Sequence, residues 1–214
     1  YVVAEVDNAR PYHGQQITYL TKVYRHKDFP HSVSYRPPDF AGFWNVTETE
    51  EAEYSETVDS NEYTVNELRT VLFPSVVGTV EIGPARLTFS DDQATRPVVV
   101  ESSSTTVEVQ SLPLPASSGF TGAVGKFDIS AAVDTTSVHV NESVPLTVKV
   151  EGKGNIDALP EPLWPNFTGW RVVQSPATSS SEVVDGQLVG SRTYKIILVP
   201  ETAGELTVPE MRYG

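Results

Sequence analysis

The sequence predicts an all-β protein made of two similar β-sandwich modules. Two observations support this prediction: the chain repeats itself at an offset of 126–127 residues, and its apolar residues fall in short β-branched and aromatic runs separated by Pro, Gly, Asn and Asp. No segment shows sustained helical periodicity. About seven short strands in some 100 residues are typical of an immunoglobulin-like sandwich, so we expect two tandem immunoglobulin-like β-sandwich domains.

The repeat is clearest around two motifs. Phe-Ala-Gly-Phe at 40–43 recurs 127 residues later as Phe-Thr-Gly-Trp at 167–170. After a gap of one residue, the segment 72–78 recurs at 198–204, with a Pro-x-x-x-Gly pattern in both copies. A period of this length indicates a duplicated domain, because solenoid repeats are only about 20–50 residues long.

Each expected strand is a run of branched or aromatic residues bounded by turn formers. The first module has such runs at 2–6, 17–24, 63–73, 79–82, 98–100 and 105–110. The second has them at 127–133, 144–150, 170–173, 182–184, 188–199 and 205–208. Apolar and polar residues alternate along 144–150, as in a strand with one buried face. Asp185-Gly186 supplies the positive φ of a tight hairpin, while Pro74 and Pro200 each end a long strand.

These runs divide the chain into a first module at 1–110, an interdomain joint at 111–125 and a second module at 126–214. The chain begins at Tyr1 and ends at Gly214 without a counterpart of 105–110, so we expect a fragment whose second sandwich lacks its last strand. Proline stiffens one half of the joint, and glycine frees the other. We expect its two apolar residues to be held between the modules. The joint residues are Pro113, Pro115, Gly119, Phe120, Gly122, Val124 and Gly125.

Composition excludes several classes of function. The net charge is −13, and an acidic chain repels phosphate backbones, so we expect no nucleic-acid binding. The first 110 residues hold 8 Lys and Arg against 17 Asp and Glu, which suits a basic partner surface. Because cysteine is absent, disulfides, thiolate metal sites and a cysteine nucleophile are excluded. No apolar run approaches the roughly 18 residues of a membrane span, so we expect no membrane contact by this chain itself.

No motif for catalysis or cofactor binding is present. The joint ends in Gly125-Lys126-Phe127, and Phe127 stands where a phosphate-binding loop needs Ser or Thr. No Gly-x-Ser-x-Gly elbow occurs, and the densest carboxylates belong to one hairpin rather than to two sides of a cleft. We therefore expect no enzyme, no catalytic residues and no cofactor.

Metal binding is not indicated by ligand spacing. The histidines lack a paired arrangement, and no Asp-x-Asp-x-Asp-Gly loop occurs, which leaves calcium at the module junction as an open question. The histidines are His13, His26, His31 and His139, and the carboxylates available for calcium are Asp91, Asp92, Asp128, Asp134 and Asp157.

Two features are candidates for partner binding. The acidic run at 48–62 includes Glu50, Glu51 and Glu53, which either steer a basic partner or protect a strand edge from aggregation. Trp44 and Trp164 lack aromatic counterparts in the other module, whereas Phe43 and Trp170 occupy equivalent positions. We therefore expect Phe43 and Trp170 to pack in the cores and Trp44 and Trp164 to be the more exposed pair. Exposed tryptophans anchor protein interfaces or stack on sugars, and we favour a protein because no polar cluster surrounds them in sequence.

Several motifs together resemble one known family. They are Tyr-His-Gly-Gln-Gln-Ile-Thr-Tyr at 12–19, Phe-x-Gly-Ala-Val-Gly at 120–125 and Gly-x-Gly-Asn-Ile at 152–156. Their order is similar to that of the BatD "oxygen tolerance" family. The resemblance implies tandem immunoglobulin-like domains in the periplasm or on the outer face of a bacterial membrane, in a parent anchored by segments not present here. It also implies non-catalytic action with von Willebrand A-domain proteins and a MoxR-type ATPase.

The expected function is therefore a non-enzymatic, extracytoplasmic protein-binding or scaffolding module that acts in envelope stress tolerance or protein maturation. The alternative is a cell-surface carbohydrate-binding module or adhesin, which needs Trp44 or Trp164 exposed beside polar side chains. An enzyme would need a deep cleft holding two carboxylates with perturbed pKa values.

Overall fold

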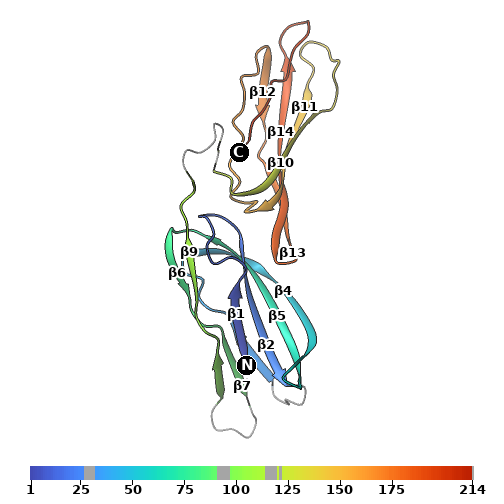
Figure 1. The fold of residues 1–214 in the computed structure, drawn as a ribbon. Helices are drawn as coiled ribbons and strands as arrows, with labels where there is room; N and C mark the ends of the chain where they lie inside the picture. Colours follow the sequence, from blue (N-terminus) through green and yellow to red (C-terminus); the bar gives the residue numbers. More distant parts are fainter. Residues whose placement is uncertain (27–31, 91–96, 114–119, 121, 214) are drawn as a thin grey trace. The chain divides into compact units, whose positions relative to one another are not determined.

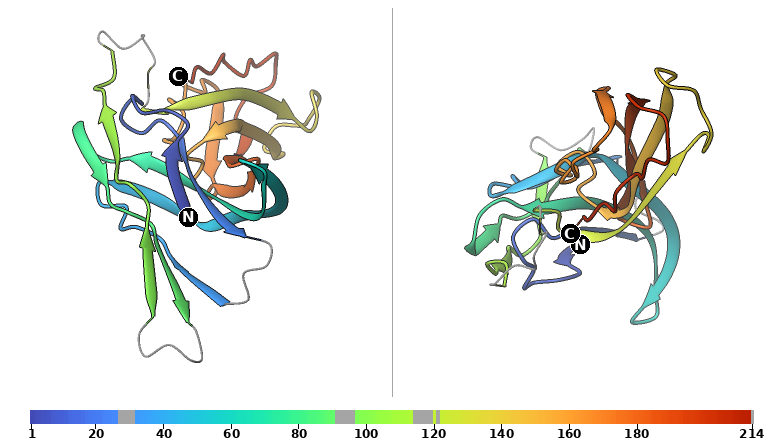
Figure 2. Two further views of the ribbon diagram at one scale, coloured as in Figure 1. Left: turned by 60° about the horizontal axis from the view of Figure 1, so that its bottom comes forward. Right: turned by 90° about the horizontal axis from the view of Figure 1, so that it is seen from above.

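The computed structural model describes residues 1–26, 32–90, 97–113, 120 and 122–213. Every regular element in these residues is a β-strand, as Figures 1 and 2 show, which confirms the predicted all-β class. The described residues contain no helix of the length and apolarity that a membrane crossing requires. The chain divides into two compact units. Unit 1 comprises Tyr1–Leu112 with Val183–Gln187, and unit 2 comprises Pro113–Glu182 and Leu188–Gly214.

An antiparallel four-stranded sheet forms the first layer of unit 1, in the order β1-β2-β5-β4. Residues of β2 alternate between buried and more exposed, because only one face of this sheet packs on the core. Ile17, Tyr19 and Val23 are on the buried face. The strands are β1 (Val2–Val6), β2 (Ile17–His26), β4 (Phe43–Val58) and β5 (Asn61–Pro74).

Two short sheets form the second layer of unit 1. One has the order β3-β7-β8, with β3 (Ser32–Arg36), β7 (Arg86–Ser90) and β8 (Val98–Glu101); the other pairs β6 (Gly78–Ile82) with β9 (Thr105–Val109). Ser102 links these sheets, because its N–H donates to the Ala85 carbonyl and its Oγ accepts from the Ala85 N–H, each at 3.0 Å. Ile82 and Val107 from this layer meet Ile17 and Leu72 from the first in a shared core.

Unit 2 is built on one five-stranded antiparallel sheet. Its order is β10-β11-β14-β12, and β13 also pairs with β14. Val144, Leu146, Val148 and Val150 are buried, which confirms the alternation predicted for this strand. Segments without long strands cover the buried face and contribute Ile156, Leu159 and Phe167 to the core. The strands are β10 (Gly125–Val133), β11 (Val144–Gly154), β12 (Trp170–Gln174), β13 (Thr178–Val184) and β14 (Gln187–Pro200).

The two units repeat the same backbone contacts at the offsets of 126–127 residues. The isolated bridge between Leu163 and Arg212 in unit 2 corresponds to the pair Arg36 and Arg86 of β3 and β7. Two turn hydrogen bonds repeat as well. Gly14 N donates to Pro74 O at 2.9 Å, and its counterpart Asn141 N donates to Pro200 O at 3.0 Å. Ser75 N donates to Gly42 O at 2.9 Å, and its counterpart Glu201 N donates to Gly169 O at 3.0 Å. The duplication inferred from the sequence is therefore present in the hydrogen-bonding pattern.

The strand prediction differs from the structure in two ways. It omitted β3, β4 and β7. The charged residues of β4 interrupt the apolar pattern by which strands were predicted, and they are tolerated because β4 is an edge strand with one side open to solvent. The strand predicted at 205–208 is wrong, since these residues lie outside any strand. Their counterpart β6 is held by β9, whereas no strand in the described part of unit 2 pairs with 205–208.

Candidate protein-binding surfaces

The open face of the unit 1 sheet, which is the face turned away from its core, carries part of the predicted partner site. Trp44 pairs with Phe73, and Glu50 pairs with Arg69, so both candidates lie on this open face. Glu51 and Glu53 have the opposite parity along β4 and belong to the other face. The structure therefore places Trp44 and Glu50 on one face of the sheet and Glu51 and Glu53 on the other.

Trp44 is the most prominent of the predicted partner residues. Its side chain is 42% exposed, near the start of the edge strand β4. Its ring lies 5.3 Å from the ring of Phe73, which is itself buried. A rigid aromatic side chain that is supported from behind and open in front is suited to insertion into a partner's pocket.

Glu67 organises the polar part of the open face. It is only 6% exposed and accepts hydrogen bonds from Tyr54 Oη at 3.1 Å and Arg69 Nε at 2.9 Å. Lys22 Nζ lies 3.7 Å away. Burial by itself raises the pKa of Glu67, but the hydrogen bonds from Tyr54 and Arg69 and the charges of Arg69 and Lys22 outweigh it and hold the pKa below its usual value. The carboxylate thus joins β2, β4 and β5.

The acidic side chains of β4 are partly balanced by neighbouring strands. Glu53 accepts hydrogen bonds from Arg25 at 3.3 Å and from Asn66 Nδ2 at 2.7 Å, and Glu50 lies 3.9 Å from Arg69. Glu51 is exposed. Because β4 is the edge of its sheet, these carboxylates border an unpaired strand edge, where charge both discourages aggregation and attracts basic partners.

An aromatic cluster on the open face was not predicted from the sequence. Tyr1 stacks on Tyr24 at 4.4 Å, and Tyr63 meets both rings edge-on. The ring of His26 lies 6.0 Å from that of Tyr63. Tyr24 and His26 lie in β2, Tyr63 lies in β5 and Tyr1 precedes β1, so only the pairing of these strands brings them together. The sequence shows Tyr1, Tyr24 and Tyr63, but it does not show the register in which their strands pair.

Trp164 has a different environment from Trp44. It is half-buried, packs against the core of unit 2 and meets Tyr194 edge-on at 5.6 Å. Its Nε1 atom is buried and has no hydrogen-bond partner among the described residues. Much of this side chain therefore serves core packing, which makes Trp164 a weaker anchor for a partner than Trp44.

The joint is described in part. Pro115 and Gly119 lie outside the described residues, while Pro113 and Phe120 are exposed and Val124 is half-buried. Gly122 has a positive φ of 103°, a conformation that favours glycine. Gly125 is the first residue of β10.

The two glycine motifs behind the family resemblance pack against each other. Gly125 pairs with Gly154, and Phe127 pairs with Gly152. A Cβ at Gly154 would lie 2.7 Å from the Phe127 ring, so the aromatic ring occupies the space left by glycine. The motifs thus have a packing role at the start of the unit 2 sheet.

The described residues contain no group of three or more His, Asp or Glu side chains arranged to hold a metal ion. Asp91, Asp92 and His31 lie outside them. The pKa of Glu67 is lowered, which is opposite to what a general acid needs.

The fold and these surfaces define an all-β protein with tandem immunoglobulin-like β-sandwich modules, a class of folds that is typically non-catalytic. Residues 131–214 match the family model described as "BatD DUF11 like domain". Over these residues the match confirms the resemblance to the BatD family stated from the sequence. Domains of this family are generally extracytoplasmic, and the match supports an extracytoplasmic β-sandwich module.

A comparison with curated proteins gave no match. Among solved structures, the chain is similar to the type II cohesin dyad from the adaptor ScaA scaffoldin of Acetivibrio cellulolyticus, at 10% identity and a TM-score of 0.27, covering 94% of this chain and 85% of that one. It is also similar to the Yersinia pseudotuberculosis adhesin InvE, at 14% identity and a TM-score of 0.24, covering 94% and 51%. The titin segment A168169 has 9% identity and a TM-score of 0.24, covering 94% and 82%. At these scores the similarities carry no inference about function.

Proposed function

We propose that this chain is a non-enzymatic protein-binding or scaffolding module of a membrane-anchored BatD-like protein. In this proposal it acts with von Willebrand A-domain proteins and a MoxR-type ATPase in envelope stress tolerance or protein maturation. The observation that carries the proposal is Trp44, a large side chain that is 42% exposed on an edge strand and supported by Phe73. The family match adds the extracytoplasmic setting.

The surroundings of Trp44 favour a protein partner with a basic surface. An exposed tryptophan is a frequent hot spot, and truncation of such an anchor costs about 2 kcal/mol or more of binding free energy. The carboxylates of β4 increase the association rate of a basic partner. The open edge of β4 also offers unpaired backbone groups to an added strand.

Affinity capture tests this proposal. The immobilised chain is exposed to detergent-solubilised membranes of its source organism, and any retained von Willebrand A-domain protein is purified and titrated against the chain. We expect Trp44→Ala to weaken binding by about 30-fold, which corresponds to about 2 kcal/mol. The matched control is Arg171→Ala, which alters the equivalent exposed position of unit 2 and should change affinity by less than about twofold.

The same variants distinguish the carbohydrate-binding alternative from the proposed protein-binding function. One set of results would favour the alternative: cell-wall polysaccharide binds the chain, Trp44→Ala abolishes that binding, and no protein is retained. The surface would then be a carbohydrate-binding site, and the proposal would fail. Retention of a von Willebrand A-domain protein that is equally strong with Trp44→Ala would remove Trp44 from the interface.

A further inference from the structure

The second layer of unit 1 covers only part of the inner face of the first layer, which is the face turned toward the core. A row of paired residues crosses this face from β2 through β5 to β4. In this row Thr21 is buried, its partner Leu68 is half-buried, and the next residue, Glu51, is exposed. Tyr35 Oη of β3 lies 3.2 Å from Thr21 Oγ1. The second layer therefore covers β2 and leaves the inner face of β4 open.

The neighbouring row shows the same loss of cover. Val23 is buried, its partner Asn66 is half-buried, and Glu53 is exposed. In this row the chain supplies its own cation, because Arg25 Nη2 donates to Asn66 Oδ1 at 2.8 Å and to Glu53 Oε2 at 3.3 Å. Glu51, in contrast, has no ion-pair or hydrogen-bond partner among the residues that the structure describes.

A cleft of ≈ 470 Å³ lies between the two layers at this place. Val33 and Tyr35 of β3 and Leu68 of β5 give it apolar and aromatic walls, and Arg25 and Glu51 give it charged ones. Both strands at its border are edge strands, since β4 ends its sheet and, within the described part of the chain, β3 pairs with β7 alone. The cleft therefore opens between two free strand edges.

The lining specifies what can cover the cleft. A strand added to the free edge of β3 would continue the second layer over β4, and its inward side chains would meet Glu51. Burial of an unpaired carboxylate is costly, so the added strand has to bring a cation. Lysine and arginine suit the mixed lining, because their aliphatic stems pack on apolar surface while the charged head group stays with its partner.

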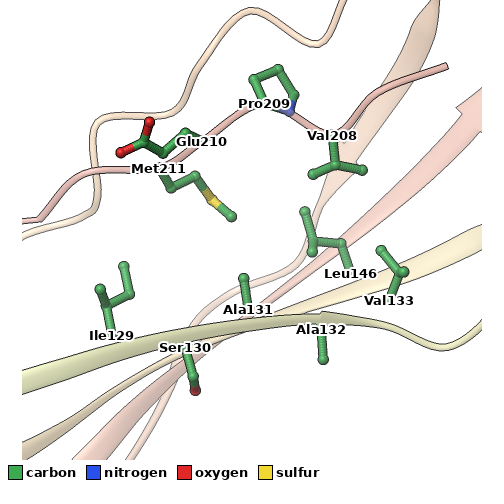
Figure 3. Close-up of a pocket in the computed structure, with 10 residues that line it drawn as sticks. All are labelled: Ile129, Ser130, Ala131, Ala132, Val133, Leu146, Val208, Pro209, Glu210 and Met211. Atoms are coloured by element: carbon green, nitrogen blue, oxygen red, sulfur yellow. The ribbon is translucent and has the colours of Figure 1, made fainter.

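The hollow beside β10 in unit 2 lacks this selectivity. It measures ≈ 340 Å³, and Figure 3 shows Ile129 and Ala131 on one side of it and Val208 and Met211 on the other. A mainly apolar lining accepts many apolar side chains and does not define one occupant. The cleft of unit 1 does define one, because Glu51 requires a positive charge.

We propose that a β-strand of a basic protein partner pairs with the free edge of β3 and places a lysine or arginine side chain in the cleft against Glu51. The stem of that side chain lies on Val33 and Leu68, and its head group meets the carboxylate. This inference rests on the proposed protein-binding function and specifies the chemistry of the partner. The surface is separate from Trp44, which lies on the open face of the first layer.

The test titrates the whole 214-residue chain with a labelled peptide, Thr-Lys-Thr-Lys-Thr-Lys-Thr, whose lysines share one face when it is extended. We expect saturable binding in fluorescence anisotropy that Glu51→Gln weakens about tenfold, because the variant removes the unpaired charge. The matched control Glu81→Gln removes the same charge from an exposed position of β6 outside the cleft and should leave binding unchanged. A peptide with glutamate in place of lysine should not bind.

Two N-methylated peptides test the pairing with β3. One is methylated on the lysine amides and the other on the threonine amides, so each loses the N–H donors along one of its two edges. A strand that pairs with β3 along one edge should lose binding with one of these peptides and keep it with the other.

Disulfide capture measures the same preference if the affinity is too low for a titration. The chain has no cysteine, so Ser34→Cys on the exposed face of β3 supplies a single thiol beside the added strand. The peptides carry cysteine in place of the second threonine and are equilibrated with the variant in a thiol buffer. The lysine peptide should be captured about tenfold more than the glutamate peptide, and Glu51→Gln should remove this preference.

Three outcomes overturn the inference: equal capture of the lysine and glutamate peptides, equal effects of Glu51→Gln and Glu81→Gln, or equal effects of the two N-methylations. Sedimentation that shows a dimer dissociated by the lysine peptide would assign the edge of β3 to a second copy and would overturn it as well. Because Trp44→Ala should leave peptide binding intact, failure of the cleft and failure of the Trp44 surface are distinguishable.

Discussion

Glu67 is a carboxylate that the fold keeps ionised. Three strands supply its partners, Tyr54, Arg69 and Lys22, and their combined effect lowers its pKa below the ordinary value of 4.5. A group whose pKa is lower in the folded than in the unfolded state stabilises the fold above its unfolded value. That stabilisation is lost as the pH falls through the folded-state pKa.

We expect Glu67→Gln to lower the free energy of unfolding by about 1–3 kcal/mol at pH 7, because it removes one partner of charge-assisted hydrogen bonds. The difference from the unaltered protein should shrink as the pH falls from 4.5 through the lower pKa of the folded state, where the native carboxylate becomes protonated. Urea unfolding at pH 7 and at pH 3 measures both values.

The matched control is Glu51→Gln, which removes an exposed carboxylate on the opposite face of β4 and should change stability by less than about 0.5 kcal/mol. An undiminished effect of Glu67→Gln at pH 3 would contradict a role for the ionised carboxylate.

At the scale of elements, two hairpins of the chain have different residues at the tip of the turn. The β13–β14 turn is Asp185-Gly186, with φ values of 52° and 70°, and the β4–β5 turn is Asp59-Ser60, with φ values of 49° and 66°. Glycine adopts positive φ without steric cost, whereas serine does not. The β4–β5 hairpin, which carries the acidic run, therefore contains a strained residue at its tip.

We expect Ser60→Gly to stabilise unit 1 by about 0.5–1 kcal/mol, because it relieves this strain. As a control, Ser55→Gly in the interior of β4 should destabilise by about the same amount, since glycine there only adds backbone entropy to the unfolded chain. Midpoints of urea unfolding compare the two variants. Loss of stability in Ser60→Gly would show that the turn contributes through the serine side chain instead.

The acidic hairpin illustrates how an element escapes prediction. Strand β4 has 16 residues, yet its sequence lacks a continuous alternation of apolar and polar residues. A register shift between Asn45 and Thr49 also interrupts the regular pairing of β4 with β5. Periodicity is weak evidence for an edge strand of this kind, because solvent on one side removes the demand for apolar residues.

At the scale of the whole molecule, the duplication predicts two hydrophobic cores, each destabilised by substitutions in that core alone. Leu72 and Leu198 occupy equivalent positions of the repeat, and both are fully buried. The module boundaries at 1–110, 111–125 and 126–214 stay a prediction that equivalent substitutions in the two cores can test.

We expect Leu72→Ala and Leu198→Ala each to cost about 2–5 kcal/mol of unfolding free energy in their own module. Tryptophan fluorescence reports on both, because Trp44 lies in the first and Trp164 and Trp170 lie in the second. The matched background Trp44→Phe leaves only the signal of the second. If both alanine variants shift every transition equally, the modules do not unfold independently.

Local chemistry made much of the fold predictable. The offset of 126–127 residues, the alternation along 144–150, the prolines that end β5 and β14 and the Asp185-Gly186 turn follow from residue types and their spacing, and the structure contains each of them. The exposure of Trp44 also agrees with its unmatched place in the repeat. Such features are local, because backbone dihedrals and strand periodicity depend on near neighbours.

Only the tertiary structure decided how distant residues combine. Strand pairing places Glu67 among Tyr54, Arg69 and Lys22 and assigns Glu50 and Glu51 to opposite faces. Register is the physical reason, because a shift of one residue in a paired strand moves every side chain to the other face, and long-range packing rather than local sequence selects it.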